Sequence, residues 1–310
     1  MASLVYIHLG RHLPWHLADS IAQARSFNCE ASIFLVAERR ALPNFRAIEE
    51  FGVTAVALED LGVSEHWDRF RRTSRLDHKF RGGFWTFTTE RFFALEHAMR
   101  ALDLQNAIHI ENDVMIYFEV ADMVARLAPL YPNLAAPFAN GDSCIPGLVY
   151  VAHPDSLVPL LEHINTQVGR RRLRQWNDML LLSGYRALRG SESIDALPIV
   201  PPEYPAQLQR RIGHVAGRPC DYSNHFDVLR GLFDAAALGQ YLGGIDPRNA
   251  PGATTVGYVS QQCVFDPSLC HLTFERDEKG RRYPALSAGG PFWPVFNLHV
   301  HSKILAPFAS

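Results

Sequence analysis

The chain is poor in lysine and has no useful cysteine pattern. Only three of its 30 basic residues are lysines, and its five cysteines form no CxxC pair and no zinc-ligand spacing. This excludes a disulfide framework and a structural zinc site of the usual kinds. The formal net charge is −2, so the overall basic field of a nucleic-acid-binding protein is also missing. We expect a reduced, cytoplasmic protein that binds no nucleic acid.

Long apolar runs are absent as well. The longest ones fall far short of the ~18–20 residues that a transmembrane helix needs. The first ten residues, MASLVYIHLG, lack a charged region followed by a long apolar stretch, so no signal peptide is predicted. With 310 residues, 47% of them hydrophobic, the chain has enough apolar surface for a sizeable core.

Short apolar runs alternate with helical patterns in the first half of the chain. Strands are expected over residues 4–9, 32–37 and 53–58 and again from residue 107, with a helix starting near Thr89 before the last of them. This alternation predicts an α/β fold with a mainly parallel sheet covered on both faces. Residues 63–85 break any period, and from residue 190 onward proline and glycine predict short strands and long loops. We therefore expect one domain.

The segment HIENDVMIY, residues 109–117, places carboxylates at the end of a strand that is expected to be buried. In an extended chain, residues i and i+2 point the same way, so Glu111 and Asp113 are expected to face one point. Ligands in open α/β sheets bind beyond the carboxyl ends of strands, and a hard divalent cation prefers oxygen ligands. The alternative is that one carboxylate caps a turn and the other is solvated.

A second candidate motif, NLHVHSK, lies near the C-terminus. If the segment is extended, Asn297, His299, His301 and Lys303 share one face. Neutral imidazole is a common metal ligand, and lysine binds phosphate as a point charge. The segment therefore predicts the far wall of a site for a metal and an anion, unless it is only the polar face of an edge strand.

These motifs together resemble GT-A fold, nucleotide-sugar-dependent glycosyltransferases, which carry a DxD or ExD metal motif. The resemblance follows the chain in order, through VYIHLGRHLP, TFTTERFFAL, HIENDVMIY, CIPGLVYV and NLHVHSK. It implies a single GT-A-like domain with a Rossmann-like sheet. Residues 1–118 are then the nucleotide-sugar-binding half, and residues 119–310 are the acceptor half with a C-terminal metal- and phosphate-binding strand.

The resemblance also implies a reaction and its parts. The activity is metal-dependent transfer of a sugar, hexosyl or pentosyl, from a nucleoside-diphosphate sugar to a glycan or lipid-linked acceptor, as in polysaccharide biosynthesis. A carboxylate pair with a histidine favours Mn²⁺ over Mg²⁺. Gly10, Arg91 and Lys303 are expected to contact the donor, and either His299 or His301 is expected to complete the metal site of Glu111 and Asp113.

Four further polar residues are candidates for the acceptor side. Asp178 precedes an apolar helical run, where it is either part of a helix cap or a carboxylate that faces the acceptor or the donor sugar. The resemblance implies that such a residue acts as the general base in inverting members of the fold. Asp234, Gln240 and Asp246 lie in a glycine-rich segment, where they either bind sugar hydroxyls or form turns.

Two other functions remain open. A metal-dependent hydrolase would use the same histidines and carboxylates to activate water, but it would be expected to have a fuller ligand set. A non-catalytic partner that binds nucleotide sugars would retain binding without turnover. By family context, a cytoplasmic enzyme of this kind can also work peripherally at the inner membrane face.

Overall fold

The computed structural model describes residues 2–43, 45–170, 176–205, 218–246, 248–249 and 256–310. Its centre is an eight-stranded sheet with the order β3-β2-β1-β4-β8-β6-β7, in which β9 pairs with β6. The strands of this sheet are β1 Ser3–His8, β2 Ser32–Ala37, β3 Thr54–Ala57, β4 Ala107–Ile110, β6 Leu134–Asn140, β7 Ser143–Cys144, β8 Leu148–Val151 and β9 Ile194–Leu197.

The pairings of this sheet confirm the predicted fold class. Strands β1 to β4 run parallel to one another, and β9 runs parallel to β6, whereas β8 is antiparallel to both β4 and β6. Since β6, β8 and β9 lie within residues 119–310 and β1 to β4 lie within residues 1–118, both predicted parts of the chain contribute to one sheet. Helices cover it, namely α1 Leu17–Phe27, α2 Ala47–Glu50, α3 Glu65–Thr73, α4 Phe84–Ala101, α5 Val120–Leu127, α6 Val158–Val168 and α7 Asp178–Arg189.

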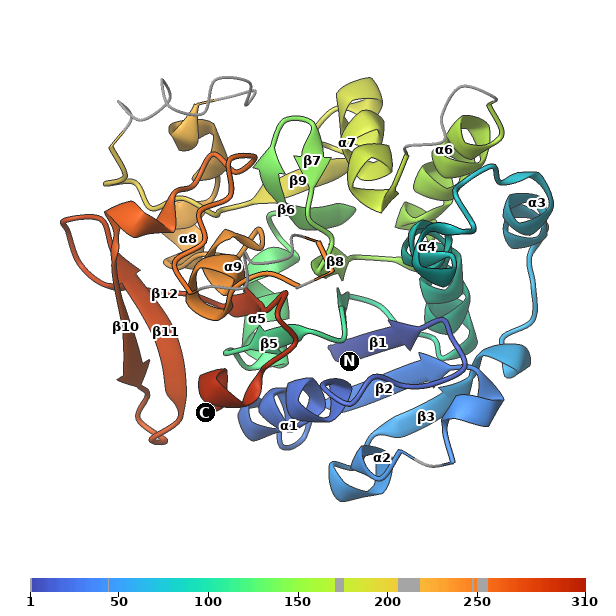
Figure 1. Cartoon of the computed structure of the whole chain (residues 1–310), viewed down its shortest axis with the longest axis horizontal. Coiled ribbons are helices and arrows are strands. Elements are labelled where there is room, and N and C mark those ends of the chain that lie inside the picture. Colours follow the sequence, from blue (N-terminus) through green and yellow to red (C-terminus); the bar gives the residue numbers. More distant parts are fainter. Residues whose placement is uncertain (1, 44, 171–175, 206–217, 247, 250–255) are drawn as a thin grey trace.

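Strand β1 shows why the sheet is covered on both faces. Its buried Leu4 and Tyr6 belong to an apolar cluster shared with α1 and α5, whereas Val5 and Ile7 belong to another shared with α3, α4 and α6. Alternate side chains of a strand point to opposite faces, so a continuous apolar run buries side chains on both faces of the sheet. In Figure 1, α1 and α4 lie on opposite sides of β1.

The remaining elements form two small sheets and two short helices. Strand β13 pairs antiparallel with β5, and β10, β11 and β12 form a three-stranded sheet. These elements are β5 Val114–Ile116, α8 Phe226–Leu229, α9 Ala237–Gly243, β10 His271–Arg276, β11 Arg282–Ser287, β12 Trp293–Pro294 and β13 Asn297–His299. The prediction of short strands after residue 190 agrees with this part of the fold.

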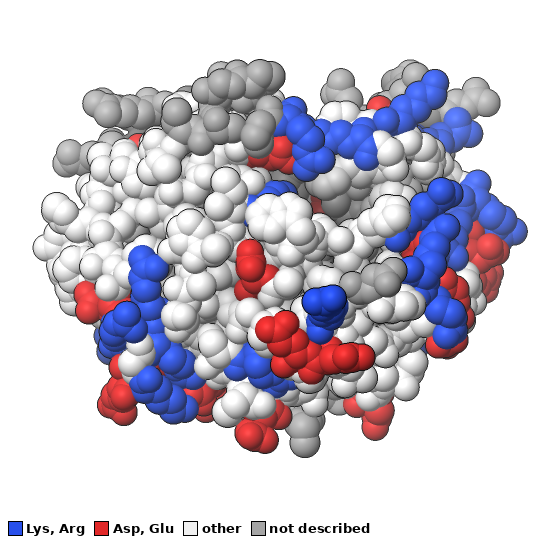
Figure 2. Space-filling view, turned by 60° about the horizontal axis from the view of Figure 1, so that its bottom comes forward, with Lys and Arg blue, Asp and Glu red and all other residues white. Residues whose placement is uncertain are grey.

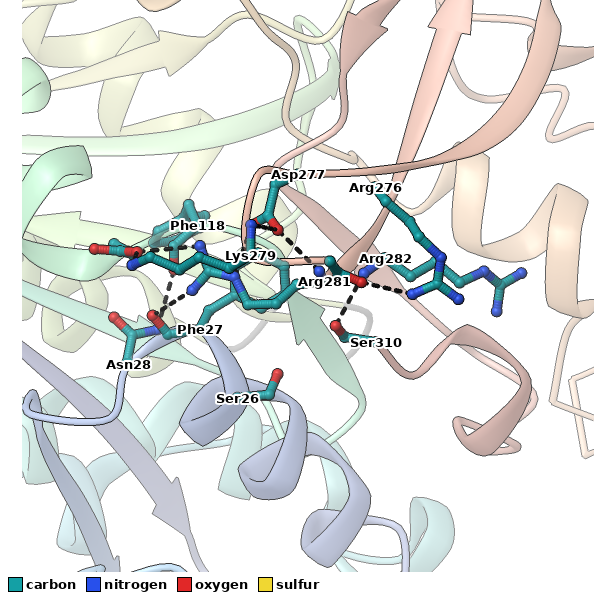
Figure 3. Close-up of polar contacts among 12 residues, drawn as sticks. Ser26, Phe27, Asn28, Phe118, Arg276, Asp277, Lys279, Arg281, Arg282 and Ser310 are labelled. Atoms are coloured by element: carbon teal, nitrogen blue, oxygen red, sulfur yellow. Dashed lines mark hydrogen bonds and ion pairs between the residues drawn. The ribbon is translucent and has the colours of Figure 1, made fainter.

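The β10–β11 hairpin lies at the opposite side of the molecule from α3 (Figure 1). Its tip is attached to the end of α1, because Arg281 donates to the carbonyl of Phe27 at 3.2 Å and pairs with Asp277 and Glu119. The backbone N–H of Arg282 donates to Ser310 Oγ at 3.0 Å (Figure 3). The hairpin therefore fixes the C-terminal residues against the first helix.

Three local expectations were wrong. Residues 65–73 form α3, because Ser64 caps the helix at Trp67 N and the helix buries Trp67 and Phe70. Helix α4 starts at Phe84, after Gly83 in the left-handed region (φ +96°), so Arg91 lies in its third turn. The C-terminal strand ends at His299.

Charged side chains are unevenly spread over the surface. Figure 2 shows Lys and Arg gathered along the upper and right-hand edges of one face and at its lower left, whereas Asp and Glu gather below its centre and much of its left side is uncharged. Among the described helices, none combines the length and the apolar composition required to cross a bilayer.

Candidate functional site

The carboxylates of the HIENDVMIY segment lie where strand β4 ends. Glu111 directly follows β4 and donates its backbone N–H to the carbonyl of Gly147 at 2.8 Å. Asp113 is 5% exposed and directly precedes β5. Strand β13 pairs with β5 so that His299 lies opposite Val114. This register places the C-terminal imidazole beside Asp113, although the two residues are far apart in sequence.

Glu111, Asp113 and His299 form a cluster with the chemistry of a cation site. One ligand atom from each lies within 4.8 Å of the others. Nε2 of His299 is 3.1 Å from Glu111 Oε2 and 3.4 Å from Asp113 Oδ1. Neighbouring ligands of an octahedral ion at ~2.1 Å lie roughly 3 Å apart, so these spacings fit three ligands on one side of a small divalent cation.

Lys303 closes the cluster from the other side, because its ammonium is paired with Asp113 Oδ2. Burial opposes ionisation of Asp113, but Lys303 and His299 together outweigh it and hold the pKa of this carboxyl well below its usual range. Asp113 is therefore a carboxylate at neutral pH, as a metal ligand must be. Lys303 reaches this position from a turn, with φ +67°.

His301 lies next to His299, with the ring centroids 4.5 Å apart in a T-shaped arrangement. Burial, together with His299 and Lys303, lowers the pKa of His301 to about 3, so its imidazole is neutral. Its Nδ1 lies 2.8 Å from the side-chain amide of Gln240. Gln240 therefore fixes the orientation of His301.

Arg91 joins two carboxylates that are far apart in sequence. Its guanidinium pairs with Glu111 and with Asp178 Oδ2, the latter at 2.8 Å, and it also donates to the carbonyl of Pro146. Burial lowers the pKa of Arg91, and Asp178 and Asp113 counteract this; an arginine stays charged in such a setting. The bridge positions Glu111 and fixes the first residue of α7 beside the cluster.

Gly147 sets the position of the His299 ring. A Cβ atom at residue 147 would lie 2.6 Å from Nδ1 and 2.9 Å from Cε1 of His299, closer than any packing allows. That Nδ1 is buried and has no hydrogen-bond partner among the described residues. Within this part of the chain the ring is held by packing, and not by the outer hydrogen bond that most metal-binding histidines make.

Gly147→Ala is therefore expected to displace the imidazole and weaken Mn²⁺ binding about 10- to 100-fold, the usual size of an outer-shell effect. Titration of the protein with Mn²⁺ measures this directly. Gly184→Ala is the matched control, because a Cβ there meets its nearest neighbour at an ordinary 3.6 Å. Equal Mn²⁺ affinities for the two variants would contradict the placement of His299 in the site.

The cluster opens into a cavity of about 480 Å³, within the range of small-molecule sites. Its wall includes the predicted Arg91, Glu111, Asp113, Asp178, Asp246, His299, His301 and Lys303. It also includes His8, His16 and Asn112, which the sequence did not single out. His8 Nδ1 lies 2.9 Å from Asn112 Nδ2, whereas His16 Nδ1 and Asn112 Oδ1 are buried and find no hydrogen-bond partner in the part of the chain that the structure describes.

A signal for this second group of polar residues existed in the sequence. His8 ends the first strand, and Asn112 lies between the two carboxylates, so a prediction that both lie at the same sheet edge could have been made from their positions. Burial lowers the pKa of His16 to about 4 and also lowers the pKa of His8. Both rings are therefore neutral hydrogen-bonding groups in the cavity wall.

Three predicted residues lie outside the cavity lining, and one of them, Asp234, uses its carboxylate in hydrogen bonds to the backbone. Gly10, Asp234 and Gln240 are not among the described residues that line the cavity. The carboxylate of Asp234 accepts hydrogen bonds from the backbone N–H groups of Leu238, Gly239 and His299 at 2.8–2.9 Å. Burial raises the pKa of Asp234 despite these bonds. Its position thus connects α9 to β13.

Asp246 does line the cavity. Its carboxylate accepts from Arg248 Nε at 3.0 Å, and this pairing lowers the pKa of Asp246 to about 2. Asn177 accepts from the backbone N–H of Leu180 at 2.9 Å and caps α7. Asp178 is therefore not the cap, and its side chain is left to face Arg91.

Comparisons with known proteins give distant matches only. No protein-family model matches the chain, and no curated protein matches it either. Solved structures that match include mouse xyloside xylosyltransferase 1, with 9% identity and a TM-score of 0.42 over 64% of this chain and 86% of that one. The galactosyltransferase LgtC matches with 10% identity and a TM-score of 0.43 over 67% of this chain and 78% of that one.

A cytidylyltransferase from Leptospira borgpetersenii also matches, with 6% identity and a TM-score of 0.37 over 64% of this chain and 75% of that one. Likenesses at such low identity do not decide which reaction this chain performs. The function is therefore argued from the residues of the cavity.

Proposed function

We propose that this chain is a metal-dependent glycosyltransferase, which transfers a sugar from a nucleoside-diphosphate sugar to a hydroxyl group of a glycan or lipid-linked acceptor. The main support is the position of Asp113 between His299 and Lys303, at the carboxyl end of the central sheet. A diphosphate leaving group needs positive charge as its bond to the sugar breaks. A cation bound by Asp113 and the ammonium group of Lys303 would supply two positive charges beside the diphosphate.

In this proposal Glu111, Asp113 and His299 hold the cation, with His301 beside them. The mixture of carboxylates with an imidazole favours Mn²⁺ over Mg²⁺. When bound, the cation supplies Lewis-acid stabilisation of the diphosphate. The neutral His301 and its partner Gln240 complete the wall next to it.

Lys303, Arg91 and Gly10 are proposed for the donor side. Lys303 contributes a second positive charge to the diphosphate, which it meets from the turn after β13. Arg91 pairs with Glu111 and Asp178. We propose that it also contacts the donor, while its ion pairs hold those two carboxylates in position. Gly10 follows β1 by two residues and belongs to the loop through which the chain can approach the nucleotide.

Asp178 and Asp246 are proposed for the acceptor side. Both carboxylates lie in the cavity wall. In this proposal Asp178 accepts the proton of an acceptor hydroxyl, and Asp246 with Arg248 orients sugar hydroxyls. Asp234 and Gln240 are proposed to act on the sugar indirectly, through His299 and His301. In this scheme residues 1–118 bind the donor and residues 119–310 supply the acceptor side and the C-terminal half of the metal site.

Lys303→Gln is expected to weaken binding of a nucleoside diphosphate about 10- to 100-fold, because a charged hydrogen bond contributes about 1.5–3 kcal/mol. Calorimetric titration with the diphosphate and Mn²⁺ measures the change. Lys279→Gln is the control, because it removes the same charge from the tip of the distant β10–β11 hairpin, where Lys279 pairs with Glu119 at the start of α5. If both variants bind the diphosphate as tightly as the wild type, Lys303 does not belong to the phosphate site.

The function itself is tested by incubating the protein with a panel of nucleotide sugars, with Mn²⁺ or with a chelator, and measuring the nucleoside diphosphate released. Slow, Mn²⁺-dependent release from one donor is the expected result and names the sugar and the base. Binding of a donor without release would favour a non-catalytic partner. Turnover of phosphate or sugar esters that lack a nucleotide would favour a hydrolase.

A further inference from the structure

One short part of the chain carries a charge opposite to that of the whole. Residues 69–89, RFRRTSRLDHKFRGGFWTFTT, contain six basic residues and one acidic residue, a formal charge of +5 in a chain of net charge −2. The same stretch contains four phenylalanines or tryptophans between residues 80 and 87 and residue 70 besides. It runs from the end of α3 through a short 3-10 helix, Phe80–Gly82, into α4.

The charges of this stretch are presented to solvent. Arg71 and Arg72 are partly neutralised by Glu90 and Asp68, at 2.6 Å and 2.9 Å. Arg69, Arg75 and Lys79 are exposed as well. Asp77 uses its carboxylate in a tight turn, accepting from the backbone N–H groups of residues 79 and 80. This turn brings the basic residues directly to the start of the aromatic ones.

The aromatic residues are unusually exposed and surround the cavity. Phe80, Phe84 and Phe87 are 38–40% exposed, and all three line the cavity. Trp15 is 65% exposed, and its ring packs edge-on against His16, which also lines the cavity. Within the described residues, three of the five exposed Phe and Trp side chains therefore line this one opening, and a fourth, Trp15, lies in sequence between the lining residues Pro14 and His16.

A second apolar contribution comes from α7. Leu180 is 38% exposed and follows Met179, which lines the cavity. The opening is thus lined by exposed phenylalanines of the 3-10 helix and the start of α4, and exposed Trp15 and Leu180 directly neighbour the lining residues His16 and Met179 in sequence. An apolar rim of this kind on a monomer marks an interaction surface, and the adjacent positive charge indicates that the partner is anionic.

We propose that the cavity rim docks on an anionic phospholipid bilayer. Aromatic side chains favour the headgroup level of a membrane, and clustered Lys and Arg bind anionic lipids. A bilayer accounts for both features at once, whereas a soluble polyanion accounts only for the charges. The surface is defined as Arg69, Arg75, Lys79, Phe80, Phe84, Phe87 and Trp15, and it is called the docking rim below.

Docking itself does not depend on the chemistry inside the cavity. If the chain transfers sugars as proposed above, however, a docking rim around the cavity mouth would present the site to an acceptor carried by the membrane. Vesicle binding without nucleotide tests the docking, and nucleotide binding without vesicles tests the proposed function, so failure of one is distinguishable from failure of the other.

The experiment is flotation of the protein with vesicles of neutral phosphatidylcholine, or of phosphatidylcholine with 30% phosphatidylglycerol, at about 0.15 M salt. The wild type is expected to float with the anionic vesicles only. The variant Arg69→Gln/Arg75→Gln/Lys79→Gln is expected to bind about 100-fold more weakly, at roughly fivefold per charge. Phe84→Ser/Phe87→Ser tests the aromatic part and is expected to lose most of the remaining affinity at high salt.

The control variant Arg46→Gln/Arg189→Gln/Arg230→Gln removes three exposed charges from other elements and should float like the wild type. Circular dichroism of each variant confirms that it is folded. An equal loss in the control, or wild-type protein that stays with neither vesicle, would overturn the proposal. Retention of the wild type on a soluble sulfated polysaccharide without flotation would also overturn it and assign the charges to an anionic polymer.

Discussion

Asp113→Asn is expected to lower Mn²⁺-dependent release of nucleoside diphosphate by at least 100-fold. The substitution keeps the shape of the side chain but removes the negative charge that both His299 and Lys303 approach. Loss of one preorganised electrostatic partner in a catalytic site typically costs 10²–10³ in rate, and loss of a charged metal ligand adds to this. Turnover of the best donor from the panel, measured at saturating Mn²⁺, gives the ratio.

Two further measurements make this result specific. Mn²⁺ titration of Asp113→Asn should show weak or no binding, a readout that does not require turnover. Asp155→Asn is the control, because this exposed carboxylate pairs with Arg100 away from the cavity and its loss should change neither measurement. Wild-type activity in Asp113→Asn at ordinary Mn²⁺ concentration would remove the metal site from the mechanism.

Arg91→Met is expected to lower the free energy of unfolding by about 3–5 kcal/mol in the presence of chelator. Without the guanidinium, the Asp178 carboxylate, 5% exposed, and the Glu111 carboxylate, 20% exposed, lose their shared counter-charge. Breaking a buried ion pair by removing one partner has a cost of this size, because a buried charge is left uncompensated. Urea denaturation followed by circular dichroism measures the change.

A double-mutant cycle separates this effect from simple loss of packing. Arg91→Met/Asp178→Asn removes both charges and should recover part of the lost stability, because interacting residues are not additive. Arg91→Lys should be intermediate, since a lysine cannot bind two carboxylates in the forked geometry of arginine. Additive effects of the two single substitutions would show that the bridge contributes little.

The strand ends of the first half could be predicted from the sequence because they depend on local patterns. Apolar runs predicted the parallel strands. Glu111 and Asp113 do converge, but across a turn at Asn112 and Asp113 that separates β4 from β5, and not along the extended chain that the i, i+2 argument assumed. Lys303 was predicted to be near the site from an extended segment, but the chain turns after His299, and Lys303 takes a left-handed conformation (φ +67°). The position agreed with the prediction while the backbone path did not.

The interactions that organise the cavity could not be predicted from the sequence. Arg91 and Asp178 are 87 residues apart, and nothing local in either helix indicates that their side chains meet. Similarly, the role of Gly147 depends on the close approach of His299, which comes from a separate strand. Such contacts follow from tertiary packing, which a single sequence does not encode in local periodicity.

The pairing of β5 with β13 has a consequence for how this protein folds. The two halves of the proposed metal site, residues 111–113 and residues 299–303, come together only when the last strand of the chain has reached a strand formed near residue 115. Contacts of such long sequence separation form late and slowly. A cation held by both segments would thus link residues 111–113 to residues 299–303. Such a link would add about 2.7 kcal/mol to the free energy of unfolding at a cation concentration 100 times its dissociation constant. The folded chain would therefore reach its full stability only after the metal is bound.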